Sequence, residues 1–224
     1  MRWILVRHGA VEPPRPGVLY GRWDVRLSPE GWQEARRAAL ALRGLAVERV
    51  LTSPLRRARS GALLVSEHLP GPPPEVVDGF VEAERGAWAG LTPEEAQRAW
   101  PDRWRRVEAD PERHAPPGGE TFGQLRRRVL AARDELLADG AHRRALVLVA
   151  HLHPIRALLA DALGLEVARW RELRVPTGSI SVLRWDGPRR AVVERVGWKP
   201  RADGDPLPME PAWRPPPGPT RKTT

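Results

Sequence analysis

Histidine and arginine side chains follow three short apolar segments of the sequence. The polar residues at these points are Arg7, His8, Ser53, Arg56, Arg57 and His151. If the apolar segments are parallel strands of one sheet, their carboxyl ends meet at one edge, where ligands collect in open α/β folds. Several cations at one edge repel one another unless an anion lies between them, and arginine donates forked hydrogen bonds to phosphate oxygens. The pattern therefore predicts a site for a phosphoryl group.

His8 is the candidate nucleophile of this site. Neighbouring arginine charges lower the basicity of an imidazole, which keeps His8 neutral and able to attack phosphorus. Gly9 allows the backbone and the substrate to approach closely. A helix expected to begin at Pro154 would direct its N-terminal backbone donors, and the positive end of its dipole, toward the same anion.

Strands and helices must alternate to bring these residues together, and the chain has this pattern. Strand-type apolar runs lie at residues 3–6, 50–51 and 145–150, and a closing strand pair is expected at Ser179 to Trp185 and Ala191 to Val196. Helix-start signals lie at Ser28, Ser53, Thr92, Thr121 and Pro154, with capping-box partners Glu95 and Gln124 and a terminating Gly164. We predict a three-layer α/β/α sandwich, with helices on both faces of a mainly parallel central sheet.

The composition limits the classes of protein to consider. The 224 residues, 41% of them hydrophobic, can bury one sizeable core. The absence of cysteine excludes disulfide scaffolds, zinc-thiolate sites, iron–sulfur clusters and cysteine nucleophiles. No stretch has the length of a signal-peptide core or a membrane span, so we expect a soluble, cytoplasmic protein with no membrane partner.

The chain is expected to form one domain followed by a tail. Residues 1–198 contain the alternating pattern, whereas eight of the last 26 residues are proline. Apart from Leu207, Met209 and Trp213, this segment has hardly any large apolar side chains. We therefore predict a proline-rich C-terminal tail at residues 199–224.

The strong positive charge raises the alternative of a nucleic-acid binder. The formal charge is +9 and the isoelectric point is near 11.2, values typical of that class. The arginines are, however, scattered among acidic residues, and the ten tryptophans show no regular spacing that would make a base-stacking platform. We therefore expect a small phosphorylated substrate and no nucleic acid as partner, and leave a homodimer open.

Five motifs in order resemble the histidine phosphatase superfamily, also called phosphoglycerate mutase-like. They are Arg7-His8-Gly9, the segment Ser53 to Ala58, Glu82 before Gly86 to Gly90, the segment Pro116 to Glu120, and His151 before Ile155-Arg156. Their order and spacing match the family across most of residues 1–198. The resemblance implies the family's fold and the hydrolysis of a small phosphomonoester through a phosphohistidine, with no metal and no cofactor.

The resemblance also implies roles for individual residues. His8 would be phosphorylated, and the phosphoryl oxygens would be held by Arg7, Arg57 and His151. Glu82 would act as general acid for the leaving alcohol and then as base for water. The family places its arginine directly before the alanine of the second motif, which favours Arg57 over Arg56.

Several positions depart from the family pattern. Ala10 stands where family members often have a polar residue, and Leu152-His153 stand where they often have a pair of glycines. Leu152 is still expected to contact the substrate, but the family pattern does not indicate how. Ser60 and Gly61 also differ, at positions expected to affect packing. Arg156 is interpreted as structural, and Trp23, Trp88, Trp100 and Trp104 as lid and core residues.

Two other enzyme classes remain as alternatives. A metal-dependent hydrolase could use His151 and His153, with His8 and Glu82 as further ligands, although adjacent arginines would repel a dication. A cofactor-dependent phosphoglycerate mutase would share every catalytic residue. We favour the hydrolase because only residues 83–115 separate Glu82 from the Pro-Pro-Gly-Gly-Glu motif, whereas mutases carry a longer insertion there.

The mutase alternative also depends on single positions. Pro93 stands about where mutases place a lysine that grips the substrate, although Arg105 and Arg106 could imitate their arginine pair. The segments Val11 to Arg26 and Glu84 to Gly118 are expected to set specificity, and the sequence does not identify the substrate.

Overall fold

The structure is a computed structural model that describes residues 1–69, 73–139, 145–187, 190–208 and 210. One six-stranded sheet has the order β3-β2-β4-β1-β5-β6. Its strands are β1 (Arg2–Arg7), β2 (Val47–Thr52), β3 (Glu75–Val76), β4 (Ala145–Ala150), β5 (Ile180–Trp185) and β6 (Ala191–Trp198). The first four strands are parallel, β5 pairs antiparallel with β1, and β5 and β6 form the expected antiparallel pair.

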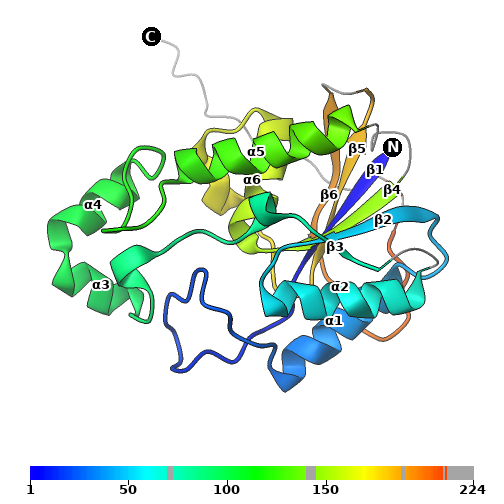
Figure 1. Cartoon of the computed structure of the whole chain (residues 1–224), viewed down its shortest axis with the longest axis horizontal. Coiled ribbons are helices and arrows are strands. Elements are labelled where there is room, and N and C mark those ends of the chain that lie inside the picture. The colour runs from blue at the N-terminus through cyan, green and yellow to red at the C-terminus, as the bar shows by residue number, and fades with distance from the viewer. Residues whose placement is uncertain (70–72, 140–144, 188–189, 209, 211–224) are drawn as a thin grey trace, which may run out of the picture.

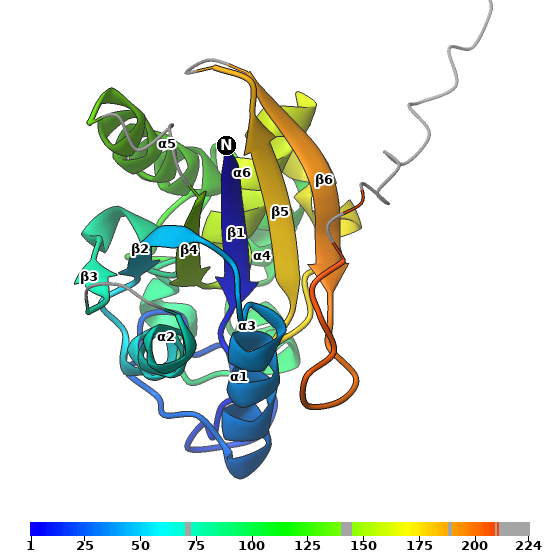
Figure 2. The same ribbon diagram turned by 90° about the vertical axis from the view of Figure 1, so that its right-hand side faces the viewer.

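Two pairs of helices cover the two faces of the sheet (Figure 2). They are α1 (Pro29–Ala41) and α2 (Arg56–His68) on one face, and α5 (Phe122–Ala138) and α6 (Leu152–Leu163) on the other. Successive residues of β1 point to opposite faces, so Ile4 and Val6 join the core under α1 and α2, while Trp3 and Leu5 join the core under α5 and α6. This arrangement confirms the predicted three-layer sandwich.

The chain between β3 and α5 contains the 3-10 turns η1 (Asp78–Phe80) and η2 (Gly86–Trp88) and the short helices α3 (Pro93–Ala99) and α4 (Pro101–Ala109). Turn η1 packs against α5, with Phe80 in the core under α5 and α6. Helices α3 and α4 form a lobe that Figure 1 shows standing away from the sheet. Capping boxes at Thr92 and Thr121 begin α3 and α5 as predicted, because each threonine and its partner three residues later satisfy each other's backbone N–H groups. A further 3-10 segment, η4 (Val167–Glu172), follows α6.

Two helix starts differ from the prediction. The helix expected from Ser53-Pro54 begins at Arg56, because the Ser53 hydroxyl accepts from Leu55 N and contacts a histidine instead of capping the helix. The helix expected from Pro154 begins two residues earlier, after His151. Gly164 ends this helix as predicted, with a φ of 63° that favours glycine.

Part of the segment predicted as a tail packs on the domain. Leu207 is buried in the core under α1 and α2, and its backbone N donates to Ala41 O at 3.0 Å. Lys199 forms an ion pair with the buried Glu34. Met209 and Trp213 lie outside the described residues, and the domain boundary at residue 198 stays a prediction. Within the described ranges, none of the helices combines the length and apolarity needed to cross a membrane.

Candidate active site

The two histidines of the predicted site lie side by side. The parallel pairing of β1 with β4 places Arg7 opposite Ala150, so the residues that follow, His8 and His151, leave the sheet at neighbouring points. Their ring centroids are 5.0 Å apart in an edge-to-face arrangement, and both side chains are buried. The topology thus brings together residues 143 positions apart in the sequence.

His8 is oriented by its own loop. Its Nδ1 lies 2.7 Å from the carbonyl oxygen of Gly9. A carbonyl only accepts hydrogen bonds, so we assign the proton of the neutral ring to Nδ1 and the lone pair to Nε2. Burial, together with the charges of Arg57 and Arg7, lowers the pKa of His8 to about 3. At neutral pH the Nε2 atom is therefore an unprotonated nucleophile.

His151 has the opposite tautomer. Its Nδ1 lies 3.3 Å from Nε of Arg57, which can only donate, so Nδ1 accepts and Nε2 carries the proton toward the Ser53 hydroxyl at 2.6 Å. Burial, with the neighbouring His8 and Arg57, holds the pKa of His151 well below its usual value. The sequence indicates Ser53 only as a polar residue at a strand end and as a helix cap. Its hydrogen bond to His151 could not be predicted from the sequence.

Arg57 lies in the site and Arg56 does not. The Arg57 side chain is fully buried, and it donates to the carbonyl oxygens of Trp23 at 2.6 Å and Gly21 at 2.7 Å. Burial lowers its pKa. Arg56 is exposed and pairs with Asp24 at the surface. Of the two alternatives left by the sequence, the structure therefore places Arg57 beside the histidines.

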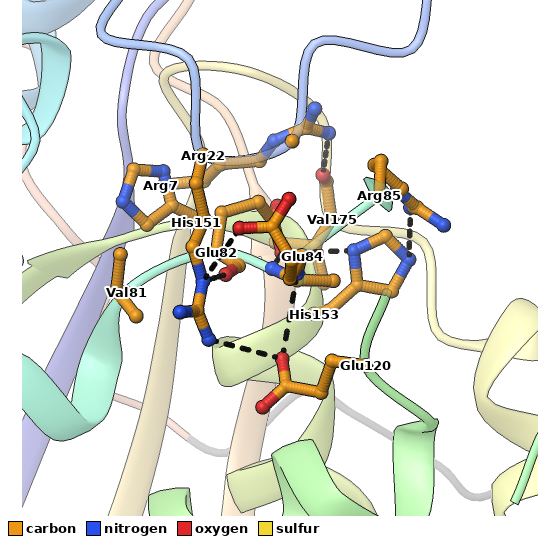
Figure 3. Close-up of polar contacts among 12 residues, drawn as sticks. Arg7, Arg22, Val81, Glu82, Glu84, Arg85, Glu120, His151, His153 and Val175 are labelled. Carbon is orange, nitrogen blue, oxygen red and sulfur yellow. Dashed lines mark hydrogen bonds and ion pairs between the residues drawn. The ribbon is translucent and has the colours of Figure 1, made fainter. Parts of the chain in front are cut away.

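Arg7 is the second arginine beside His8. One of its terminal nitrogens donates to Val175 O at 2.6 Å, while its buried Nε has no hydrogen-bond partner in the described part of the chain (Figure 3). A buried donor without a partner costs about 1–3 kcal/mol. An anion beside His8 would supply the missing acceptor.

The carboxylate of Glu82 enters the site from the loop after η1. The residue is 7% exposed, and its backbone oxygen accepts from Arg22 Nε at 3.1 Å and from Arg128 at 3.2 Å. Arg128 in turn binds both carboxylate oxygens of Glu120, the last residue of the Pro-Pro-Gly-Gly-Glu motif. Glu120 also accepts from Arg22 (Figure 3), so the motif positions the Glu82 loop, a role the sequence did not assign to it.

His153 and Arg85 contact Glu82 from its other side. His153 Nδ1 lies 2.9 Å from Glu82 Oε1, and His153 Nε2 lies 3.3 Å from a terminal nitrogen of Arg85 (Figure 3). Arg85 can only donate, so Nε2 of His153 accepts and the proton of the neutral ring lies on Nδ1. This Nδ1–H donates to the carboxylate of Glu82. Burial acts to raise the pKa of Glu82, but the interactions with His153, His151 and Arg85 outweigh it and hold the pKa well below its usual value. Burial lowers the pKa of His153.

The remaining predicted residues lie around this centre. Leu152 begins α6, and its side chain packs against the core under α5 and α6; its contact with the substrate stays a prediction. Trp88 is buried and lies 4.9 Å from Trp104, as expected for core and lid residues, whereas Trp23 is 42% exposed and packs over Gly90.

The arrangement provides no ready ligand set for the metal-dependent alternative. His151 faces Arg57 and Ser53, and His153 faces Glu82 and Arg85, so the ring nitrogens of both are engaged. Across the described ranges no three His, Asp or Glu side chains are grouped to hold a metal ion. A depression of about 840 Å³, lined in part by Trp185, lies at the opposite end of the strands.

Comparison with known proteins agrees with the fold and the motifs. Residues 3–197 match the model of the histidine phosphatase superfamily (branch 1). The chain belongs to this superfamily, and the resemblance read from its motifs is confirmed.

The relatives include phosphatases and mutases. A bifunctional protein of Mycobacterium tuberculosis is 35% identical over 183 residues, which are 81% of this chain and 49% of that protein. The chain thus spans about half the length of this relative. A glucosyl-3-phosphoglycerate phosphatase of Mycolicibacterium vanbaalenii is 32% identical over 92% of this chain and 88% of its own. A 2,3-bisphosphoglycerate-dependent phosphoglycerate mutase of Parvibaculum lavamentivorans is 30% identical over 82% and 90%.

Solved structures share the architecture. A mycobacterial glucosyl-3-phosphoglycerate phosphatase in complex with inorganic phosphate superposes with a TM-score of 0.76 at 28% identity, covering 90% of this chain and 99% of that one. The alpha-ribazole phosphatase from Shigella flexneri, at 23% identity, gives a TM-score of 0.78.

Proposed function

We propose that the chain hydrolyses a small phosphomonoester through a phosphohistidine on His8. The observation that carries this proposal is the neutral His8 ring, which lies edge to face with the His151 ring and close enough to Arg7 and Arg57 for their charges to lower its pKa. Membership of the superfamily supports it, as does a related phosphatase whose solved structure contains inorganic phosphate.

The first half of the reaction transfers the phosphoryl group to His8. Nε2 attacks phosphorus, and the bond from phosphorus to the ester oxygen breaks. Arg7 and Arg57 stabilise the charge that develops on the equatorial oxygens, and the Nε2–H of His151, which donates to Ser53 in the free enzyme, transfers its hydrogen bond to one of them. The departing oxygen takes its proton from Glu82. Glu82 is a carboxylate in the empty site, and we infer that the arriving phosphoryl dianion offsets the arginine charges and raises its pKa, so that it carries a proton when substrate is bound.

The second half releases phosphate. After the alcohol has left, Glu82 is again a carboxylate and takes a proton from water. The water oxygen attacks phosphorus, the bond to Nε2 breaks, and inorganic phosphate and neutral His8 result. The phosphoryl group that raises the pKa of Glu82 is still present on His8 at this stage, which makes the carboxylate a stronger base toward water than in the free enzyme.

A phosphoglycerate mutase is the second candidate, because relatives at 30% identity carry that name. The arginines that could imitate a mutase's substrate contacts do not support it. Arg105 and Arg106 are both exposed on α4, and Arg105 pairs with Asp102 on the same helix. Pro93 is the first residue of α3 and supplies no cation.

The two candidates are separated by their products. We would incubate the enzyme with 3-phosphoglycerate and with simple phosphomonoesters, and measure phosphate release alongside 2-phosphoglycerate formation in the presence of 2,3-bisphosphoglycerate. Phosphate release that exceeds isomerisation supports the hydrolase. Efficient isomerisation with little phosphate release would identify a mutase using the same residues.

We further propose that the enzyme works in the cytoplasm on a small phosphorylated substrate, without nucleic acid or membrane as partner. Sedimentation of the purified chain would decide whether it forms the homodimer that the sequence leaves open.

A further inference from the structure

A cavity of about 310 Å³ adjoins the active site under the lobe formed by α3 and α4. Its wall toward the reaction centre is made by Arg85, His153 and Arg156, and His153 contacts the proposed general acid Glu82 directly. A leaving alcohol that takes its proton from Glu82 must lie near this wall. The cavity is therefore placed to hold the part of the substrate that departs.

Aromatic side chains form much of the cavity. Trp88 and Trp104 lie 4.9 Å apart, and Phe122 stacks on Trp170 with ring centroids 5.6 Å apart. Such surfaces favour a ligand with a flat apolar face.

The charges around the cavity do not cancel. Arg7, Arg57, Arg85 and Arg156 make no ion pair with any carboxylate in the part of the chain that the structure describes. Carboxylates act on them only through space: Glu82 and Asp24 on Arg57, Glu82 and Glu120 on Arg85, and Glu82 on Arg156. The proton-bearing His153 lies between Glu82 and Arg85. When substrate is bound Glu82 carries a proton, so the phosphoryl dianion offsets the charges of Arg7 and Arg57. Glu120 acts on Arg85, and the positive charge of Arg156 remains.

Arg156 is the cation left over. It is half-buried on α6, and its Nε donates to Leu173 O at 3.0 Å. Burial and the neighbouring Arg7 lower its pKa to about 10, so it stays charged at neutral pH. The other charged residues of the cavity, Glu108 and Arg171, are exposed and opposite in sign, and offset each other. The sequence-based interpretation of Arg156 as structural leaves this charge unexplained.

We propose that Arg156 binds a second anionic group, a carboxylate or another phosphate, on the leaving part of the substrate, whose flat face packs among the cavity's tryptophans. This inference rests on the proposed function and names its substrate class: a phosphomonoester of an anionic alcohol with a planar or ring-shaped body. In this arrangement the phosphoryl group binds at His8, and the second anionic group binds at Arg156 on α6.

Matched substrates test the second charge. We would compare phenyl phosphate with 3-carboxyphenyl phosphate, and glycerol 3-phosphate with 3-phosphoglycerate, using the ratio of kcat/KM within each pair as the preference for charge. The wild-type enzyme should prefer the carboxylated member of each pair. Arg156→Gln should reduce that preference about tenfold or more, the effect of a lost charge-assisted hydrogen bond, and Arg156→Lys should restore part of it. Arg43→Gln, at an exposed position after α1, should leave the preference unchanged.

The apolar face is tested separately with Trp104→Ala. This variant should lower kcat/KM for the two aryl substrates more than for the glycerol pair. An equal effect on both pairs would contradict packing against the tryptophans. Wild-type enzyme without a preference for charge, or an Arg156→Gln variant that loses activity equally on both members, would overturn the role of Arg156.

Binding without turnover separates this proposal from the proposed function. In a His8→Ala protein, calorimetry should find tighter binding of 3-carboxyphenyl phosphate than of phenyl phosphate, and the difference should vanish when Arg156→Gln is added. If His8→Ala binds 3-carboxyphenyl phosphate more tightly than phenyl phosphate while the wild-type protein releases no phosphate, the hydrolase proposal is refuted and the anion site is supported. If the wild-type protein releases phosphate but His8→Ala binds the two aryl phosphates equally, the hydrolase proposal is supported and the anion site is refuted.

Discussion

Nδ1 of His153 lies 2.9 Å from Oε1 of Glu82, and both side chains are buried. The other ring nitrogen of His153 faces Arg85. The hydrogen-bond directions make His153 a neutral histidine between the cation Arg85 and the carboxylate of Glu82. His153 is therefore a positioning residue that fixes the orientation and charge state of Glu82.

Removal of His153 should change the pH dependence of the reaction. His153→Ala deletes a hydrogen bond that favours the charged form of Glu82, so the pKa of Glu82 rises. The limb of the kcat/KM profile that reports Glu82 should move to higher pH by about one unit for an alkyl phosphate. His153→Gln, which retains a donor, should shift it less, and Arg85→Gln should shift it in the same direction as the alanine variant. A lower rate with an unchanged profile would assign His153 a merely structural role.

Loss of the Glu82 proton should matter most for basic leaving groups. Glu82→Gln should slow hydrolysis of an alkyl phosphate far more than that of 4-nitrophenyl phosphate, whose oxygen departs without protonation. Steady-state kcat/KM for the two substrates measures the difference. An equal loss on both would indicate that Glu82 positions the substrate and does not transfer a proton.

The buried histidine should make stability depend on pH. The pKa of His8 is about 3 in the folded protein and near 6.5 in the unfolded chain. Below pH 6.5 the unfolded chain binds a proton that the folded protein does not, so the free energy of unfolding falls as the pH is lowered. The loss approaches about 1.4 kcal/mol per pH unit for such a group, and His151 adds to it.

Urea unfolding at pH 7.5, 6.0 and 5.0 checks this expectation. These values stay above the range in which Glu82, with its lowered pKa, takes up a proton. His8→Asn should flatten the decline compared with the wild-type protein. Parallel declines in the two proteins would show that His8 titrates normally.

Truncation after Trp198 should destabilise the domain. It removes Leu207, whose burial is worth about 1.5–3 kcal/mol, and Lys199, the partner of Glu34. Glu34 also accepts from Ala10 N at 2.7 Å, two residues after His8, so kcat should fall as well. Truncation after Glu210 keeps these contacts and serves as the matched control. Equal melting temperatures for the two truncated proteins would show that the Leu207 contact contributes nothing.

Local signals allowed most of the fold to be predicted from the sequence. The capping boxes at Thr92 and Thr121 and the terminating Gly164 act within one helical turn, so their sequence spacing is sufficient. The continuously apolar run of β4 identified a central strand. The helix start at Ser53 was wrong because its hydroxyl contacts His151, 98 residues away, and no local pattern contains that contact.

The site could be predicted in part. Strand ends indicated His8 and His151, and the family motif distinguished Arg57 from Arg56. The direction of each ring could not be obtained from the sequence, so His153 was interpreted as a metal ligand in the rival mechanism when its nitrogens face Glu82 and Arg85. The docking of Leu207 likewise depends on a tertiary contact with α1 and α2 that composition does not reveal.

The most direct test of the central claim is a rapid-quench experiment with a 32P-labelled phosphomonoester. The account predicts an acid-labile, base-stable phosphoenzyme in the wild-type protein. The labelled species should persist in His153→Ala and be absent in His8→Ala, because the proposed nucleophile is the unprotonated Nε2 of His8. Labelling that survives in His8→Ala, or a label stable to acid, would contradict a phosphohistidine at this position.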